Sequence, residues 1–137
     1  MKKLNWLFLL LFSFAFIACD DDDDDVDLDA TAPTITVISP VANTTYAPGD
    51  VVPVRADIED NLGLDEVRVV LMRPDGTETV LNDDSIRDFL NDNTEAEVDF
   101  DVNLDANQPV GAYMLRFEAV DEQDNTAQET VTFSVAM

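Results

Sequence analysis

The sequence contains no histidine, and its single cysteine, Cys19, directly follows an apolar segment near the N-terminus. No serine has the context of a nucleophile elbow, and no glycine-rich phosphate loop is present. Aspartates are so abundant that any two could lie close together, so a carboxylate pair is weak evidence for a hydrolase. We therefore expect a protein that is not an enzyme. A hydrolase would instead require measurable turnover that disappears when one specific carboxylate is replaced.

Positive charge is also scarce. The 137 residues include seven lysines and arginines against thirty aspartates and glutamates. Lys2 and Lys3 precede Cys19, so a chain that begins at Cys19 keeps five arginines and a formal charge of 25 negative. A surface of this charge repels nucleic acid and anionic lipid headgroups. The composition therefore excludes DNA and RNA as partners.

Residues 1–18 have the features of a secretory signal peptide: two lysines, a short apolar run and a small residue at its end. The run from Leu4 to Ala18 is shorter than the roughly 20 residues that a membrane-spanning helix needs. Ala18 before Cys19 resembles the lipobox of bacterial lipoproteins, in which the cysteine is acylated and becomes the new N-terminus. This resemblance implies a membrane anchor at Cys19. The alternative is an ordinary signal peptide with an incidental cysteine.

An acidic run follows Cys19, with eight aspartates among residues 20–29. Like charges in a row favour an extended, solvated chain, so we interpret residues 19–32 as a disordered tether. Acidic residues behind an acylated cysteine also resemble the surface-export signal of Bacteroidota lipoproteins, which implies an outer-membrane protein exposed at the cell surface. A simple spacer is the alternative. The run is not an EF-hand loop, because it lacks the central glycine and the closing glutamate.

Residues 33–137 alternate between apolar and polar side chains in several short runs, which predicts β-strands. Seven such strands without a long helix indicate one domain, an all-β, Ig-like antiparallel sandwich. One segment breaks the pattern: Ser85 can cap a short helix near 85–92. The side chains expected to face the core are Val52, Val54, Ala56, Ile58, Val67, Val69, Leu71, Val98, Phe100, Val102, Leu104, Tyr113, Leu115, Phe117, Ala119, Val131, Phe133 and Val135.

Three stretches, residues 31–34, 60–64 and 119–125, resemble bacterial Ig-like domains of the cadherin-like and fibronectin-like group. The sequence Gly111-Ala112-Tyr113 resembles the tyrosine corner of such folds, although plain core packing would also explain Tyr113. With the lipobox, the whole chain resembles small Bacteroidota lipoproteins that carry one Ig-like domain of unknown function. The resemblance implies a fold and a location but no activity.

A cation site is the first candidate functional site. In an Ig-like sandwich, the loop after the second strand and the loop after the sixth lie at the same end, where the tether also enters. Oxygen ligands without histidine or cysteine favour Ca²⁺ over zinc or copper. The alternative is a solvated acidic rim whose residues serve turns. The candidate ligands are Asp57, Glu59, Asp60, Asn61, Asp65, Asp121 and Asp124, and the same loops also carry Glu122 and Asn125.

A face of one sheet is the second candidate. Arg68, Val70, Met72, Met114 and Arg116 should point outward from adjacent strands, forming an apolar and basic strip that a partner could bind. Two alternatives would remove this strip: residues 84–93 could cover it, or the arginines could pair with Glu66 and Glu118.

These observations predict a surface-anchored, non-catalytic Ig-like module for adhesion or for binding a protein or glycan, with calcium as a candidate stabilising ion and no other cofactor. The alternative is a structural or accessory subunit of a glycan-uptake or fimbrial assembly. A stable stoichiometric partner would favour the second hypothesis.

Overall fold

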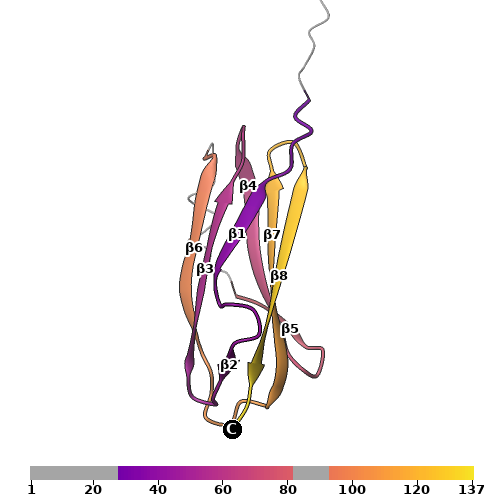
Figure 1. The fold of residues 1–137 in the computed structure, drawn as a ribbon. Helices are drawn as coiled ribbons and strands as arrows, with labels where there is room; N and C mark the ends of the chain where they lie inside the picture. Colours follow the sequence, from indigo (N-terminus) through magenta and orange to yellow (C-terminus); the bar gives the residue numbers. More distant parts are fainter. Residues whose placement is uncertain (1–27, 82–92) are drawn as a thin grey trace, which may run out of the picture.

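In the computed structural model, residues 28–81 and 93–137 are described, and they form eight strands in two facing sheets (Figure 1). The smaller sheet has the order β1-β3-β6, with β1 (Thr34–Ser39), β3 (Val51–Glu59) and β6 (Glu95–Asn103). The larger sheet has the order β2-β8-β7-β4-β5, with β2 (Thr45–Tyr46), β8 (Thr126–Val135), β7 (Gly111–Asp121), β4 (Leu64–Met72) and β5 (Glu78–Val80). The predicted all-β sandwich is confirmed.

No helix occurs in the part of the chain that the structure describes, and therefore none there is long and apolar enough to cross a bilayer. The helix expected near 85–92 lies outside the described residues.

The strand pairings are antiparallel with one exception, which the sequence pattern did not predict. The chain leaves the smaller sheet after β1, at Pro40, and its two-residue strand β2 then pairs in parallel with β8. Backbone hydrogen bonds from Asn43 N to Thr132 O (2.8 Å) and from Ser134 N to Thr44 O (2.9 Å) hold this crossing in place. Proline has no N–H to continue a ladder, which explains the break.

The core lies between the sheets and follows the predicted alternation, except that Val131 on β8, predicted to face the core, is only half-buried. The side chains of Tyr113, Phe117 and Phe133 are its largest members and are at most 1% exposed. Phe133 stacks on Tyr113 with ring centroids 5.4 Å apart and meets Tyr46 edge-on at 5.6 Å. Predicted core residues near the edge of the smaller sheet, such as Phe100 and Val102, are partly buried and pack against the central cluster.

Tyr113 forms the hydrogen bond expected of a tyrosine corner. Its hydroxyl donates to Pro109 O at 2.7 Å and accepts from Gln108 Nε2 at 3.0 Å, which fastens the loop before β7 to the core. Gly111 in this loop has φ +143°, and a Cβ there would lie 2.8 Å from Pro74 Cγ in the β4–β5 turn. Glycine alone permits this close approach.

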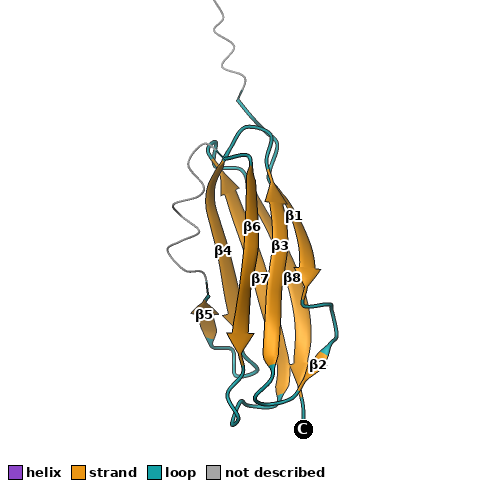
Figure 2. Cartoon of the chain, turned by 90° about the vertical axis from the view of Figure 1, so that its left-hand side faces the viewer, coloured by secondary structure: helices purple, strands orange, loops and turns teal. Residues whose placement is uncertain are grey.

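The β3–β4 loop, the β7–β8 turn and the segment that precedes β1 meet at one end of the sandwich, and the C-terminus lies at the other end (Figures 1 and 2). Figure 2 shows the smaller sheet lying in front of the larger one, with β1 on the outer side of β3. The elements therefore bring three acidic segments, distant in sequence, to a common end.

Candidate cation site and charged faces

Three aspartates from these three segments form what we call the carboxylate cluster: Asp29, Asp60 and Asp121. Each offers one carboxylate oxygen, and these three oxygens lie within 4.8 Å of one another. Asp29 precedes β1, Asp60 follows β3, and Asp121 ends β7. The backbone of Glu122 donates to Gly63 O at 3.0 Å and so ties the two loops together.

The β3–β4 loop orients Asp60 by a tight turn. Its Oδ2 atom accepts hydrogen bonds from the backbone N–H groups of Leu62 (2.9 Å) and Gly63 (2.8 Å). This Asx-type turn is the usual local use of an aspartate. The second oxygen, Oδ1, is buried and has no hydrogen-bond partner in the described part of the chain. Turn formation therefore explains the position of Oδ2 but gives Oδ1 no hydrogen bond.

Asp121 is the most deeply buried member of the cluster, with 1% of its surface exposed. Its Oδ1 atom accepts from the backbone N–H groups of Gln123 (2.8 Å) and Asn125 (2.7 Å), and its Oδ2 atom accepts from Asn125 Nδ2 (2.7 Å). Among the described residues, the ion pairs of the arginines go to other acids, and a carboxylate buried without a positive partner is costly unless something else compensates it.

Asp29 joins the cluster from the segment that leads away toward Cys19. The backbone N–H of Thr31 donates to Asp29 Oδ1 at 2.9 Å, while Asp29 Oδ2 is buried without a described partner. The Thr31 backbone N–H, together with the side chain of Asn61, holds the pKa of Asp29 below its ordinary value. The carboxylate is therefore ionised at neutral pH.

The cluster concentrates negative charge that the described residues do not neutralise. Within residues 28–81 and 93–137, the ion pairs of Arg55, Arg68 and Arg116 all go to other acids. The ligand oxygens lie within 4.8 Å of one another, so two unit charges there repel by about 3.5 kcal/mol or more at an effective dielectric constant of about 20. A cation would turn this repulsion into attraction, and the unpartnered Asp29 Oδ2 and Asp60 Oδ1 are the oxygens available to bind it.

The structure brings only part of the sequence-predicted set together. Asp60 and Asp121 are in the cluster, and Asn61 contributes to the electrostatic environment of Asp29. The other candidates lie outside it: Asp57, Glu59, Asp65 and Asp124 are exposed, the first two on the outer face of β3. Asp29 was missing from the predicted ligands, although its tether was expected to enter beside these loops.

Asp57 and Glu59 instead belong to an acidic outer face of the smaller sheet. Asp57 lies opposite Glu97 on β6, and Glu59 lies opposite Glu95. The backbone and side chains of these residues border a surface hollow of about 420 Å³. Like charges directly opposite each other on neighbouring strands are destabilising, so this face strengthens the negative field of the domain.

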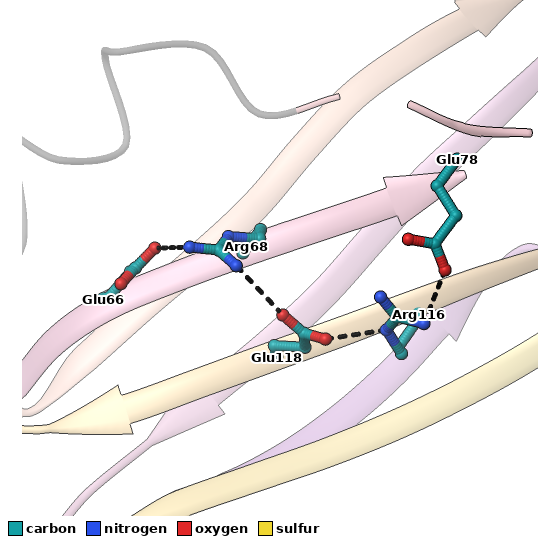
Figure 3. Close-up of polar contacts among 5 residues, drawn as sticks. All are labelled: Glu66, Arg68, Glu78, Arg116 and Glu118. Atoms are coloured by element: carbon teal, nitrogen blue, oxygen red, sulfur yellow. Dashed lines mark hydrogen bonds and ion pairs between the residues drawn. The ribbon is translucent and has the colours of Figure 1, made fainter. Parts of the chain in front are cut away.

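The predicted partner face carries an unbroken chain of ion pairs (Figure 3). Arg68 pairs with Glu66 at 2.6 Å and with Glu118 at 3.7 Å. Arg116 pairs with Glu118 at 2.7 Å and with Glu78 at 3.1 Å, and these hydrogen bonds, the one with Glu78 foremost, raise the pKa of Arg116. Three glutamates thus neutralise two arginines.

The apolar side chains of this face are also less exposed than predicted. Val70 is 3% exposed, whereas Met72 and Met114 are half-buried. Arg116 lies directly opposite Val70, and Met114 lies opposite Met72, as expected for neighbours on one face. The arrangement matches the alternative in which local glutamates occupy the arginines, and it leaves little basic surface for a partner.

The profile of a domain of unknown function, DUF4625, matches residues 17–136. The chain belongs to this family. The match to DUF4625 covers the sandwich together with Cys19 and the acidic run, but the family description assigns no activity. No curated protein matches the sequence.

Solved structures resemble this DUF4625 domain in fold at low sequence identity. Spo0M, a sporulation control protein from Bacillus subtilis, shares 10% identity and a TM-score of 0.50, and the match covers 78% of this chain and 50% of Spo0M. The fibronectin(III)-like modules of Clostridium thermocellum CbhA share 17% identity and a TM-score of 0.46, with coverage of 74% and 94%. A Niemann-Pick type C2 protein from the Japanese carpenter ant shares 10% identity and a TM-score of 0.48, with coverage of 77% and 90%.

Proposed function

We propose that the protein is a non-catalytic binding module, stabilised by calcium and held at the outer face of the outer membrane by lipid on Cys19. The observation that carries the calcium part is the carboxylate cluster, in which two buried oxygens, Asp29 Oδ2 and Asp60 Oδ1, have no described partner. The family and the fold are consistent with such a module, because a sandwich of this type commonly presents loops and faces to other molecules.

Calcium fits the cluster better than other common metal ions. The donors are carboxylate oxygens, and hard cations such as Ca²⁺ prefer oxygen ligands. Ca²⁺ takes about 6–8 oxygens in flexible geometry, so three aspartates would leave positions for water and backbone carbonyls. Mg²⁺ demands near-ideal octahedral geometry and gives up its water reluctantly, which disfavours a site assembled from three separate segments.

The anchoring part of the proposal rests on the sequence. Cys19 is the sole cysteine and directly follows Ala18 at the end of an apolar run. The family match begins at residue 17 and so includes this cysteine and the aspartates behind it. An acyl chain contributes about 0.8 kcal/mol per buried methylene, and more than one chain is needed for stable anchoring.

The binding role follows from the chemistry that the domain offers. One oxygen of Asp29, one of Asp60 and both of Asp121 accept hydrogen bonds, and residues 33–137 contain no histidine or thiol to act beside them. We therefore infer contact with a protein or glycan ligand without turnover.

Calcium should raise the melting temperature of the protein, and Asp60→Asn should abolish this rise. A ligand at a hundredfold excess over its Kd stabilises the folded state by about 2.7 kcal/mol, and each kcal/mol raises Tm by about 4–8 °C in a domain of this size. The amide oxygen of the substituted side chain can still accept the N–H groups of Leu62 and Gly63, so the turn is kept. Without calcium, the variant should be as stable as the parent or more stable, because one repelling charge is gone.

Asp65→Asn is the matched control for this experiment, because it removes the same charge from an exposed neighbouring position. It should keep the full calcium response. Mg²⁺ and Na⁺ at equal ionic strength separate binding from screening. An equal response to all three ions, or an unchanged calcium response in Asp60→Asn, would contradict the cation site.

A further inference from the structure

The segment that joins the domain to its N-terminal tether supplies one third of the carboxylate cluster. We infer that a divalent cation bound there acts as a clasp: it fastens residues 28–33 to the β3–β4 loop and the β7–β8 turn, and so makes the direction of the tether depend on calcium. This inference rests on the cation site proposed above. It adds a mechanical consequence that neither the family nor the fold assigns.

Pro33 is buried where the segment joins β1, but residues 28–32 make few hydrogen bonds to the rest of the described chain. Asn125 Nδ2 donates to Asp29 O at 2.8 Å, and the side chain of Asn61 interacts with the Asp29 carboxylate. The hydrogen bond between Thr31 N and Asp29 Oδ1 lies within the segment and fastens it to nothing else. Leu28 is 80% exposed, so its side chain adds little packing. Side-chain amide hydrogen bonds in contact with water are individually weak.

The carboxylate of Asp29 changes its role when a cation is present. Without a cation, Asp29 faces two further carboxylates within 4.8 Å, and this repulsion weakens the attachment of the segment to the domain. With a cation, the same three groups share one positive partner, and the repulsion becomes attraction. The sign of the interaction between the segment and the domain thus depends on the ion.

The side chain of Asn125 links the Asp29 segment to Asp121 in a second way. Its side-chain amide donates both to Asp121 Oδ2 (2.7 Å) and to the backbone oxygen of Asp29 (2.8 Å). A cation that orders Asp121 therefore also orders the donor that holds the Asp29 backbone. The Asp29 side chain is half-buried, and its Oδ2 atom is buried with no hydrogen-bond partner among the described residues, so this oxygen is available to bind the ion.

The inference can be tested on the complete mature chain, residues 19–137, with Cys19→Ser so that it stays in solution. A nitroxide spin label at Leu28→Cys reports the mobility of the segment, and a second label at the exposed Ala30→Cys guards against a local effect of the first. Calcium should broaden both spectra to those of an immobilised label. In Asp29→Asn, both labels should stay mobile, and the calcium affinity measured by titration calorimetry should fall at least tenfold.

Asp124→Asn is the matched control, because Asp124 lies in the β7–β8 turn at φ +66°, a conformation that asparagine also adopts. It should behave as the parent. If Asp29→Asn bound calcium as tightly as the parent, or if both labels stayed mobile in the calcium-bound parent, the clasp would be wrong and the cation site would stand. If the parent bound no calcium, the cation site itself would be wrong, and the clasp with it.

Discussion

Replacing Cys19 with alanine should move the protein from the membrane fraction to the soluble fraction. In the proposed function, the acyl chains on Cys19 hold the protein in the bilayer, while its acidic surface is repelled by anionic headgroups. Because stable anchoring needs more than one chain, the loss should be nearly complete.

Detergent phase partitioning of cell membranes measures this change directly. The parent should enter the detergent phase, and Cys19→Ala should remain in the aqueous phase. Asp124→Asn, which alters an exposed turn far along the chain, should partition as the parent does. Retention of Cys19→Ala in the detergent phase, or mass spectrometry showing an unmodified Cys19, would favour an ordinary signal peptide with an incidental cysteine.

The replacement Phe133→Ala should lower the free energy of unfolding by about 3–5 kcal/mol. Phe133 is 1% exposed on β8 and contacts the rings of Tyr113 on β7 and Tyr46 on β2. Its removal would leave a cavity where these three strands meet and would also loosen the parallel β2–β8 pair. Since a domain of this size has a total stability of about 5–15 kcal/mol, the loss should be a large fraction of the whole.

Urea unfolding in excess chelator isolates this effect from the cation site. Val110→Ala is the control, since Val110 is 53% exposed in the loop before β7, and its change should stay within about 0.5 kcal/mol. A loss below about 1 kcal/mol for Phe133→Ala would mean that the stacked aromatic rings do not organise the core.

The sequence predicted the strands well because one face of each sheet is buried. Alternate residues of a strand face the same core, and this gives the sequence an apolar period of two. On β3 these residues are at most 1% exposed: Val52, Val54, Ala56 and Ile58. The two-residue strand β2 escaped detection because Thr45-Tyr46 is too short to show a period. Its pairing depends on the path of the chain after Pro40, which is a tertiary effect.

The candidate cation site was predicted less completely, for a geometric reason. Asp57, Glu59 and Asp60 are close in sequence, but Asp57 and Glu59 lie on β3 with exposed side chains, while Asp60 begins the loop beyond it. Asp29 was classed with the aspartates of the tether, since composition does not distinguish the last acidic residue of a run from the others. Only its position beside the β7–β8 turn separates it from them.

The partner face shows that sequence periodicity places side chains on a face but does not give all of their ion-pair partners. The pattern placed Arg68 and Arg116 on one face of adjacent strands, and they do lie there. Glu66 and Glu118 were expected as their partners and do pair with them. Glu78 was not expected, because it reaches Arg116 from β5, a separate strand of the same sheet. The side chains that neutralise a charge depend on strand order, which the sequence pattern alone left open.

The most direct test of the account is a crystal structure of the mature chain grown with excess calcium, with anomalous diffraction data collected to locate the ion. We expect an anomalous peak bounded by the carboxylates of Asp29, Asp60 and Asp121, with calcium–oxygen distances of about 2.3–2.6 Å. Ordered loops with no such peak, and with water alone between these carboxylates, would show that the end of the sandwich is a solvated acidic rim.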